Sequence, residues 1–126
     1  MKNKTIVAVV IILLVVILGV VYFAKKAESG PGKYDTFAQC LGEKGAKFYG
    51  TFWCPYCRAQ KDLFGKSADL LPYIECSTLD GNSRLQICID QKIEKYPTWE
   101  FADGERMQGK VSLEDLAKKT SCELPK

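Results

Sequence analysis

One stretch decides the fold: Phe48-Tyr49-Gly50-Thr51-Phe52-Trp53-Cys54-Pro55-Tyr56-Cys57-Arg58. It begins as an apolar, aromatic strand and passes into a Cys-x-x-Cys motif where a helix is expected to start. A cysteine at a helix N-terminus meets unpaired backbone N–H groups and the positive end of the helix dipole, and both favour the thiolate. Because the thiolate is the nucleophile of disulfide exchange, the motif predicts a redox pair. Cys54 is the expected nucleophile, and Cys57, one helical turn later, is the expected resolving thiol.

A structural disulfide and a zinc site are the two alternative interpretations of this pair. The zinc ligands would be Cys54, Cys57, Cys76 and Cys88. Zinc ribbons usually contain two short Cys-x2-Cys pairs, whereas 11 residues separate the second pair here. The chain contains no histidine, which excludes His-based metal sites and His-assisted acid–base chemistry. We therefore expect no metal and no cofactor.

The N-terminal residues differ in composition from the rest of the chain. After a short tail, residues 1–4, Thr5 to Ala24 form an uncharged run of 20 mostly apolar residues. As a helix, at about 1.5 Å per residue, this run matches the hydrocarbon core of a bilayer. A cleavable signal peptide, the alternative, usually has a shorter apolar region and a small-residue cleavage site. We expect an uncleaved transmembrane helix over 5–24, a linker over 25–33 and a folded domain over 34–126.

Cysteine content and charge indicate the compartment in which the domain works and whether it has a basic surface for nucleic acid. Six cysteines in about a hundred residues point to an oxidising compartment, so we expect the domain to be extracytoplasmic at a cell membrane. Lysines flank the apolar run on both sides and give only a weak orientation preference. The net charge is +3, but from residue 29 onward 14 basic residues balance 14 acidic ones. The domain therefore has no excess of positive charge for nucleic acid.

The rest of the chain alternates helical and extended patterns. The expected elements are a helix at 34–43, a strand at 46–52, a helix at 55–64, a strand at 70–76, a short helix at 84–93, a hairpin of 98–101 with 106–109, and a last helix that Ser112 caps. This order is mixed α/β.

That order, with Cys-x-x-Cys after the first strand and a lone proline before the hairpin, resembles the thioredoxin fold, a central mixed sheet flanked by helices. Members of the family carry a cis-proline that faces the redox pair, and Pro97 matches its position. The resemblance implies that Pro97 excludes metal and that the backbone of Tyr96 pairs with substrate like an added strand. Trp53, Pro55 and Tyr56 are further candidates for substrate docking, although Trp53 equally fits a packing role.

A longer set of motifs is similar to the thioredoxin-like domain fused to bacterial and plant homologues of vitamin K epoxide reductase. The matching segments are 45–50, 52–57, 60–61, 63–65, 73–76, 96–99 and 112–117. In those fusions the domain carries electrons between substrate thiols and a quinone-linked membrane enzyme. The resemblance implies cysteine-containing protein substrates and a quinone-linked membrane oxidoreductase of that type, here as a separate partner because the chain has one predicted span.

The sequence departs from the family at one position. Thioredoxins hold a buried carboxylate six residues before the first active-site cysteine, where it relays protons for the second one. Phe48 occupies that position here. Glu75, on the neighbouring predicted strand, is a candidate replacement, but the sequence does not assign the general base.

Four further cysteines, Cys40, Cys76, Cys88 and Cys122, allow three pairings. We favour Cys76 with Cys88, for which the loop-closure argument gives about 3 kcal/mol of stabilisation, and Cys40 with Cys122, which would tie the two ends of the domain. A rival interpretation makes Cys76–Cys88 a second redox pair. Most disulfides of small secreted domains are structural, which favours the first interpretation.

The sequence thus predicts a membrane-anchored, extracytoplasmic thiol–disulfide oxidoreductase of the protein disulfide oxidase, isomerase or reductase class. One alternative is a thiol reductase, either for cytochrome maturation or of the glutaredoxin kind, since Cys-Pro-Tyr-Cys also occurs in glutaredoxins. Another is a non-catalytic binding module with a thioredoxin fold, tethered at the membrane.

Overall fold

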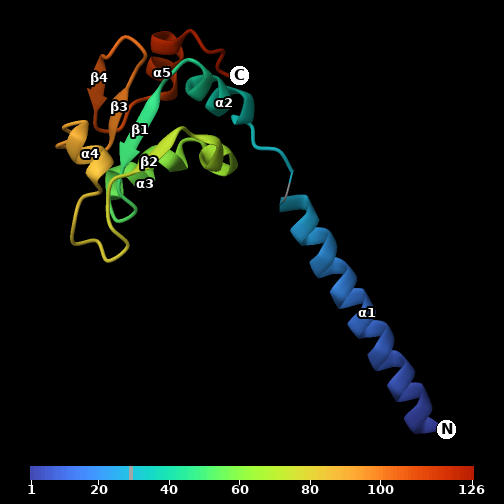
Figure 1. Cartoon of the computed structure of the whole chain (residues 1–126). Helices are drawn as coiled ribbons and strands as arrows, with labels where there is room; N and C mark the ends of the chain where they lie inside the picture. The colour runs from blue at the N-terminus through green and yellow to red at the C-terminus, as the bar shows by residue number, and fades with distance from the viewer. Residues whose placement is uncertain (29) are drawn as a thin grey trace. The chain divides into compact units, whose positions relative to one another are not determined.

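The structure is a computed structural model, and it describes residues 1–28 and 30–126, apart from the side chains of residues 27 and 28. The chain forms two units, Met1–Gly30 and Pro31–Lys126. The predicted linker over 25–33 includes residue 29, which lies outside the described residues. Each unit has its own secondary structure (Figure 1).

The first unit is the single helix α1 (Lys2–Glu28). Its mean hydropathy reaches 3.4, and none of its most apolar window is buried inside the protein. By length and composition the helix can cross a membrane, although a signal sequence would meet the same criteria. The helix extends beyond the predicted span of 5–24 because the lysines at both ends are good helix formers.

The second unit is built on a four-stranded mixed sheet in the order β2-β1-β3-β4 (Figure 1). The strand β1 (Lys47–Gly50) pairs in parallel with β2 (Tyr73–Glu75) and antiparallel with β3 (Thr98–Glu100). The hairpin is completed by β4 (Arg106–Gln108), antiparallel to β3. The predicted α/β class, a thioredoxin-like mixed sheet with a long apolar helix before it, is confirmed.

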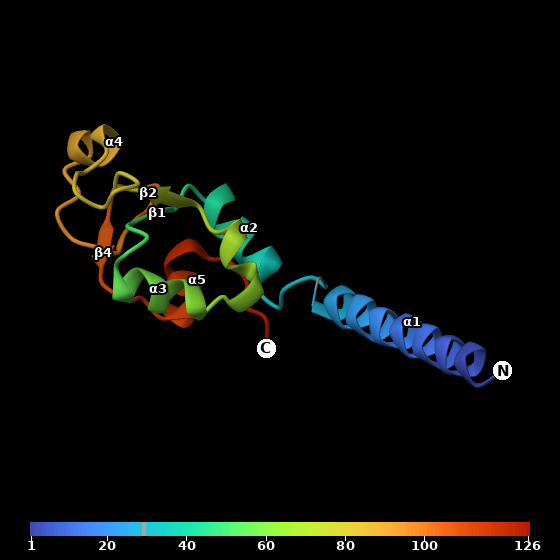
Figure 2. The same cartoon turned by 90° about the horizontal axis from the view of Figure 1, so that it is seen from below.

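Helices flank this sheet. They are α2 (Asp35–Glu43), α3 (Pro55–Asp62), the 3-10 helix η1 (Gly65–Leu70), α4 (Gln86–Asp90) and α5 (Leu113–Thr120). Alternate residues of β1 serve two cores, because successive side chains of a strand point to opposite faces. Phe48 belongs to the larger core with Trp99 and Leu116, whereas Tyr49 belongs to a smaller one with Ile93. Figure 2 shows α3 and α5 together on one side of the strands and α4 on the other.

The predicted strand over 70–76 is too long. Its first residue, Leu70, instead ends the 3-10 helix η1, and the strand keeps only Tyr73–Glu75. The apolar pair Leu70-Leu71 suggested a strand, but Leu70 is exposed and only Leu71 enters the core. Pro72 has no N–H to give to a ladder, although its carbonyl accepts the N–H of Phe48 at 2.8 Å.

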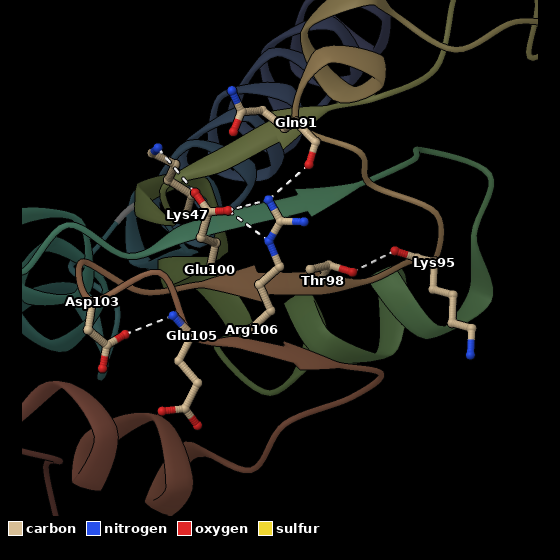
Figure 3. Close-up of polar contacts among 8 residues, drawn as sticks. All are labelled: Lys47, Gln91, Lys95, Thr98, Glu100, Asp103, Glu105 and Arg106. Atoms are coloured by element: carbon tan, nitrogen blue, oxygen red, sulfur yellow. Dashed lines mark hydrogen bonds and ion pairs between the residues drawn. The ribbon is translucent and has the colours of Figure 1, made fainter.

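A network of charged side chains ties the hairpin to β1 (Figure 3). Glu100 accepts hydrogen bonds from Arg106 Nε at 2.8 Å and Nη2 at 2.6 Å, and from Lys47 Nζ at 3.3 Å. Arg106 Nη2 also donates to the carbonyl of Gln91, just after α4, at 2.8 Å. Burial alone would raise the pKa of Glu100, but its hydrogen bonds to Arg106 and Lys47 hold that pKa below the ordinary value.

Candidate active site

Cys54 lies where the chain leaves the sheet and enters α3. It is the N-cap residue of α3, with extended backbone angles, and its Sγ accepts the backbone N–H of Cys57 at 3.3 Å. Pro55 stands in the first turn, where a missing N–H leaves no intrahelical bond unmade. An N–H aimed at sulfur from the start of a helix stabilises negative charge there. The predicted helix start at the Cys-x-x-Cys motif is therefore present.

A buried glutamine fixes the position of α3. Gln60 Nε2 donates to the carbonyl of Val111 at 3.0 Å, and the N–H of Val111 donates to Gln60 Oε1 at 2.7 Å. Gln60 is fully buried, and both ends of its amide are satisfied. These reciprocal bonds hold the helix that carries both thiols against the segment before α5. The sequence alone gave no indication of this role, because the two residues are 51 positions apart.

The turn before β3 lies beside the thiol of Cys54. The Tyr96–Pro97 peptide bond is cis, and Cys54 Sγ lies 3.8 Å from the carbonyl oxygen of Tyr96. Trp53 packs edge-on against the ring of Tyr96, with 6.4 Å between the ring centroids. The structure therefore brings together residues that the sequence separates by more than 40 positions, as the resemblance to thioredoxins implied.

An exposed aromatic surface surrounds the thiols. Phe52, Trp53 and Tyr56 are 51%, 49% and 67% exposed. Trp53 is held in place by its indole N–H, which donates to Ser77 Oγ at 3.0 Å. Trp53 thus both packs and presents a face to solvent, which unites the two roles that the sequence left open. Leu79, on the loop after β2, is 99% exposed and was not predicted as part of any site.

Cys57 lies on the buried side of α3, together with Gln60. Only 1% of the residue is exposed, and Cys54 and Cys57 are both free thiols. Burial, reinforced by the hydrogen bond with Cys54, raises the pKa of Cys57 to about 12. A backbone hydrogen bond with Thr51 and the charge of Lys61 act in the opposite direction. Cys57 is therefore protonated at neutral pH and must lose a proton before it can act as a nucleophile.

The other four cysteines form two disulfides. Cys40 on α2 is bonded to Cys122, which follows α5, and Cys76, after β2, is bonded to Cys88 on α4. Both pairings are those favoured from the sequence. Cys76 and Cys88 are fully buried in the smaller core. That bond also uses two of the four sulfurs that the zinc interpretation required.

Comparison with known proteins gives a relative whose name is informative about chemistry. No protein-family model matches the chain. Over 108 residues the chain is 37% identical to the thiol-disulfide oxidoreductase LTO1 of Arabidopsis thaliana, a match that covers 82% of this chain and 28% of the relative. The chain thus spans little more than a quarter of that relative's length.

Proposed function

We propose that the domain over 34–126 is a thiol–disulfide oxidoreductase, with Cys54 as the attacking and leaving thiol and Cys57 as the resolving thiol. The observation that carries the proposal is the backbone N–H of Cys57 on Cys54 Sγ at the start of α3. That geometry stabilises the sulfur when it becomes an anion and when it leaves as one. The name of the plant relative supports the same chemistry.

In the oxidising direction the reaction begins with a disulfide between Cys54 and Cys57. A substrate thiolate attacks Cys54 Sγ, a mixed disulfide forms, and Cys57 leaves as a thiolate that takes up a proton. The second substrate thiol then loses its proton and attacks the substrate sulfur of the mixed disulfide, which releases Cys54. The substrate gains a disulfide, and the two electrons remain on Cys54 and Cys57 as thiols.

Substrate binding is proposed to use the surface beside Cys54. The Tyr96 carbonyl oxygen lies 3.8 Å from Cys54 Sγ, so an extended peptide that pairs there would bring its cysteine to the reacting sulfur. Pro97 fixes this turn, and Pro55 starts the helix beneath it. Trp53 and Tyr56 supply aromatic area for apolar side chains of a protein substrate.

We also propose that α1 anchors the domain at a cell membrane on its extracytoplasmic side. The length and hydropathy of α1 support the anchor, and two disulfides in a small domain support an oxidising compartment. A quinone-linked membrane oxidoreductase of the vitamin K epoxide reductase type is the proposed electron partner. This partner rests on the similarity of segments 45–50, 52–57 and 96–99 to the domain fused to such enzymes.

Two cysteine variants of the full chain, expressed in membranes, test the proposal. Cys57→Ser should accumulate mixed disulfides with substrate proteins, because Cys54 can still attack but nothing resolves the bond. Cys54→Ser should accumulate none, which makes it the matched control. Equal trapping by the two variants, or unchanged turnover in either, would refute the assignment and favour a tethered binding module.

A further inference from the structure

Cys57 needs a proton acceptor, and the position used by thioredoxins cannot supply one. Phe48 stands there and packs flat against Trp99, with ring centroids 4.8 Å apart, and edge-on against Tyr73 at 5.2 Å. Phe48 is fully buried. A carboxylate relay for Cys57 must therefore come from another element.

The register of β1 and β2 places two polar side chains on the face of the sheet against which α3 packs. Phe48 pairs with Tyr73, and Gly50 pairs with Glu75. Since alternate residues of a strand share a face, Tyr73 and Glu75 lie on the side of the sheet that carries Phe48 and Gly50. This is the side on which α3 and Cys57 pack.

Gly50 shows how close Cys57 and Tyr73 come to each other. A Cβ at Gly50 would lie 2.9 Å from Cys57 Sγ and also 2.9 Å from Tyr73 Cε2. The sulfur and the ring edge therefore approach the same point above the Gly50 backbone and are at most about 6 Å apart. The missing side chain of Gly50 allows this approach.

Glu75 is joined to the hydroxyl of Tyr73 by a hydrogen bond. The Tyr73 hydroxyl donates to Glu75 Oε2 at 2.8 Å, while Glu75 Oε1 accepts the N–H groups of Cys76 at 3.1 Å and Ser77 at 2.9 Å. Lys61 Nζ, on α3, lies 3.4 Å from the centre of the Tyr73 ring. A half-buried polar pair on β2 thus lies against α3, which carries the buried thiol.

Each of these groups also affects the protonation of its neighbours. Burial is the largest cause that raises the pKa of Tyr73. The hydrogen bond to Glu75 raises it further, as do the charges of Cys57 and Cys54. The titratable and charged groups around Cys57 are Cys54 at the N-cap of α3, Lys61 on α3, Tyr73 and Glu75 on β2, and Tyr96 before β3. Of these groups, only Glu75 is a carboxylate.

We propose that Glu75 and the Tyr73 hydroxyl form the proton relay of Cys57. The inference rests on the proposed function. When a mixed disulfide on Cys54 is resolved, the proton of Cys57 passes through one bridging water to the Tyr73 oxygen as Tyr73 gives its own to Glu75. The Cys57 sulfur then attacks Cys54, the Cys54–Cys57 bond forms, and the other thiolate leaves and takes a proton from water. In the oxidising direction the same path returns a proton to Cys57 as it leaves.

The experiment follows the resolving step directly. The reduced full chain in detergent micelles is mixed with glutathione disulfide, quenched in acid at intervals, and its glutathione adduct on Cys54 is quantified by mass spectrometry between pH 6 and pH 9. Tyr73→Phe keeps the ring, and Glu75→Gln keeps an acceptor oxygen for the backbone N–H groups. Tyr34→Phe and Glu43→Gln are the matched controls, because neither residue belongs to the site.

We expect the adduct of the unmodified chain and of both controls to decay with little dependence on pH. In Tyr73→Phe and Glu75→Gln the decay should be at least about tenfold slower at pH 7 and should rise with hydroxide concentration, since general acid–base groups typically contribute that much or more. Decay within twofold of the unmodified chain in both variants across the pH range would overturn the relay alone. If the unmodified chain forms no adduct, the proposed function fails first and the relay with it. Should Glu75→Gln not fold, Tyr73→Phe decides the question.

Discussion

Gly50 is the residue at which the absence of a side chain matters most. Its backbone is approached by Cys57 Sγ and by the Tyr73 ring, each 2.9 Å from where a Cβ would stand. We predict that Gly50→Ala lowers the free energy of unfolding by about 1–3 kcal/mol, as overpacking of a core does, and also slows disulfide exchange. Urea denaturation of the reduced protein and an exchange assay measure the two effects.

Gly42→Ala is the matched control. Gly42 lies on α2, and the nearest atom to its added Cβ would be Pro72 Cβ at 3.6 Å, an ordinary contact. Alanine there should leave stability unchanged or raise it by up to about 1 kcal/mol, because alanine is the better helix former. Equal losses in both variants would contradict the close approach at Gly50.

The two thiols of the motif should differ in reactivity. Burial raises the pKa of Cys57 to about 12, so its thiol stays protonated, whereas the Cys54 sulfur faces the Cys57 N–H at the helix end. We predict that iodoacetamide at pH 8 gives the reduced, folded protein one adduct, on Cys54. Peptide mass spectrometry locates it. Comparable labelling of Cys57 would contradict the burial on which its role depends.

Among the elements, the hairpin depends on the charge of Glu100. Because the pKa of Glu100 is lower in the folded than in the unfolded chain, its contribution to stability is present above the ordinary value of 4.5 and is lost as pH falls through the lowered value. Glu100→Gln should cost about 1 kcal/mol at pH 7, between the values for exposed pairs and for charged hydrogen bonds. The free energy of unfolding of Glu100→Gln should also fall less on acidification than that of the unmodified chain.

Unfolding in urea at pH 7 and below pH 4 tests this prediction. Glu105→Gln is the control, since the partner of Glu105 is Lys119 and both lie in an exposed ion pair (Figure 3 shows Glu105 away from the Arg106 network). Glu105→Gln should have the smaller effect. If Glu100→Gln retained the full acid sensitivity of the unmodified chain, another carboxylate would be responsible for it.

Features defined by local pattern were predictable from sequence, whereas a distant contact such as that of the Tyr96–Pro97 turn with Cys54 was predicted only through the resemblance to thioredoxins. Ser112 caps α5 by accepting the N–H of Asp115 at 3.1 Å, as its position before an acidic turn indicated. The Cys54 and Cys57 pair was also predictable, because the Cys-x-x-Cys spacing is local in the sequence. Glu75 was named as a candidate base from its place on the neighbouring strand. Tyr73 was missed, because its position near Cys57 depends on the parallel register of β1 and β2, which no local pattern specifies. The 3-10 helix over 65–70 was missed because its sequence is mostly polar and has no helical pattern, and its last residue, Leu70, was assigned with Leu71 to a strand.

Across the whole domain, the two disulfides constrain very different lengths of chain. Cys40 and Cys122 are separated by 82 positions, whereas Cys76 and Cys88 are separated by 12. On the loop-closure argument, the paired alanine variant of the first bond should lose about 4.5 kcal/mol and that of the second about 3 kcal/mol. Urea denaturation under oxidising conditions measures both losses.

The same pair of variants tests whether Cys76–Cys88 is structural. A structural bond predicts that Cys76→Ala with Cys88→Ala loses stability but still exchanges disulfides through Cys54. Loss of exchange at temperatures where the variant remains folded would instead identify a second redox pair. The full burial of both sulfurs favours the structural role.

The central claim, that Cys54 and Cys57 form a working redox pair, is tested most directly by the reduction potential of their bond. It is measured in the full chain, with Cys76–Cys88 intact, by equilibration against dithiothreitol and glutathione buffers. We predict a value between about −270 and −120 mV, the range from thioredoxin-like reductants to strong oxidants, and its place in that range gives the direction of the reaction. A value below about −300 mV, which is typical of inert structural bonds, would contradict the claim.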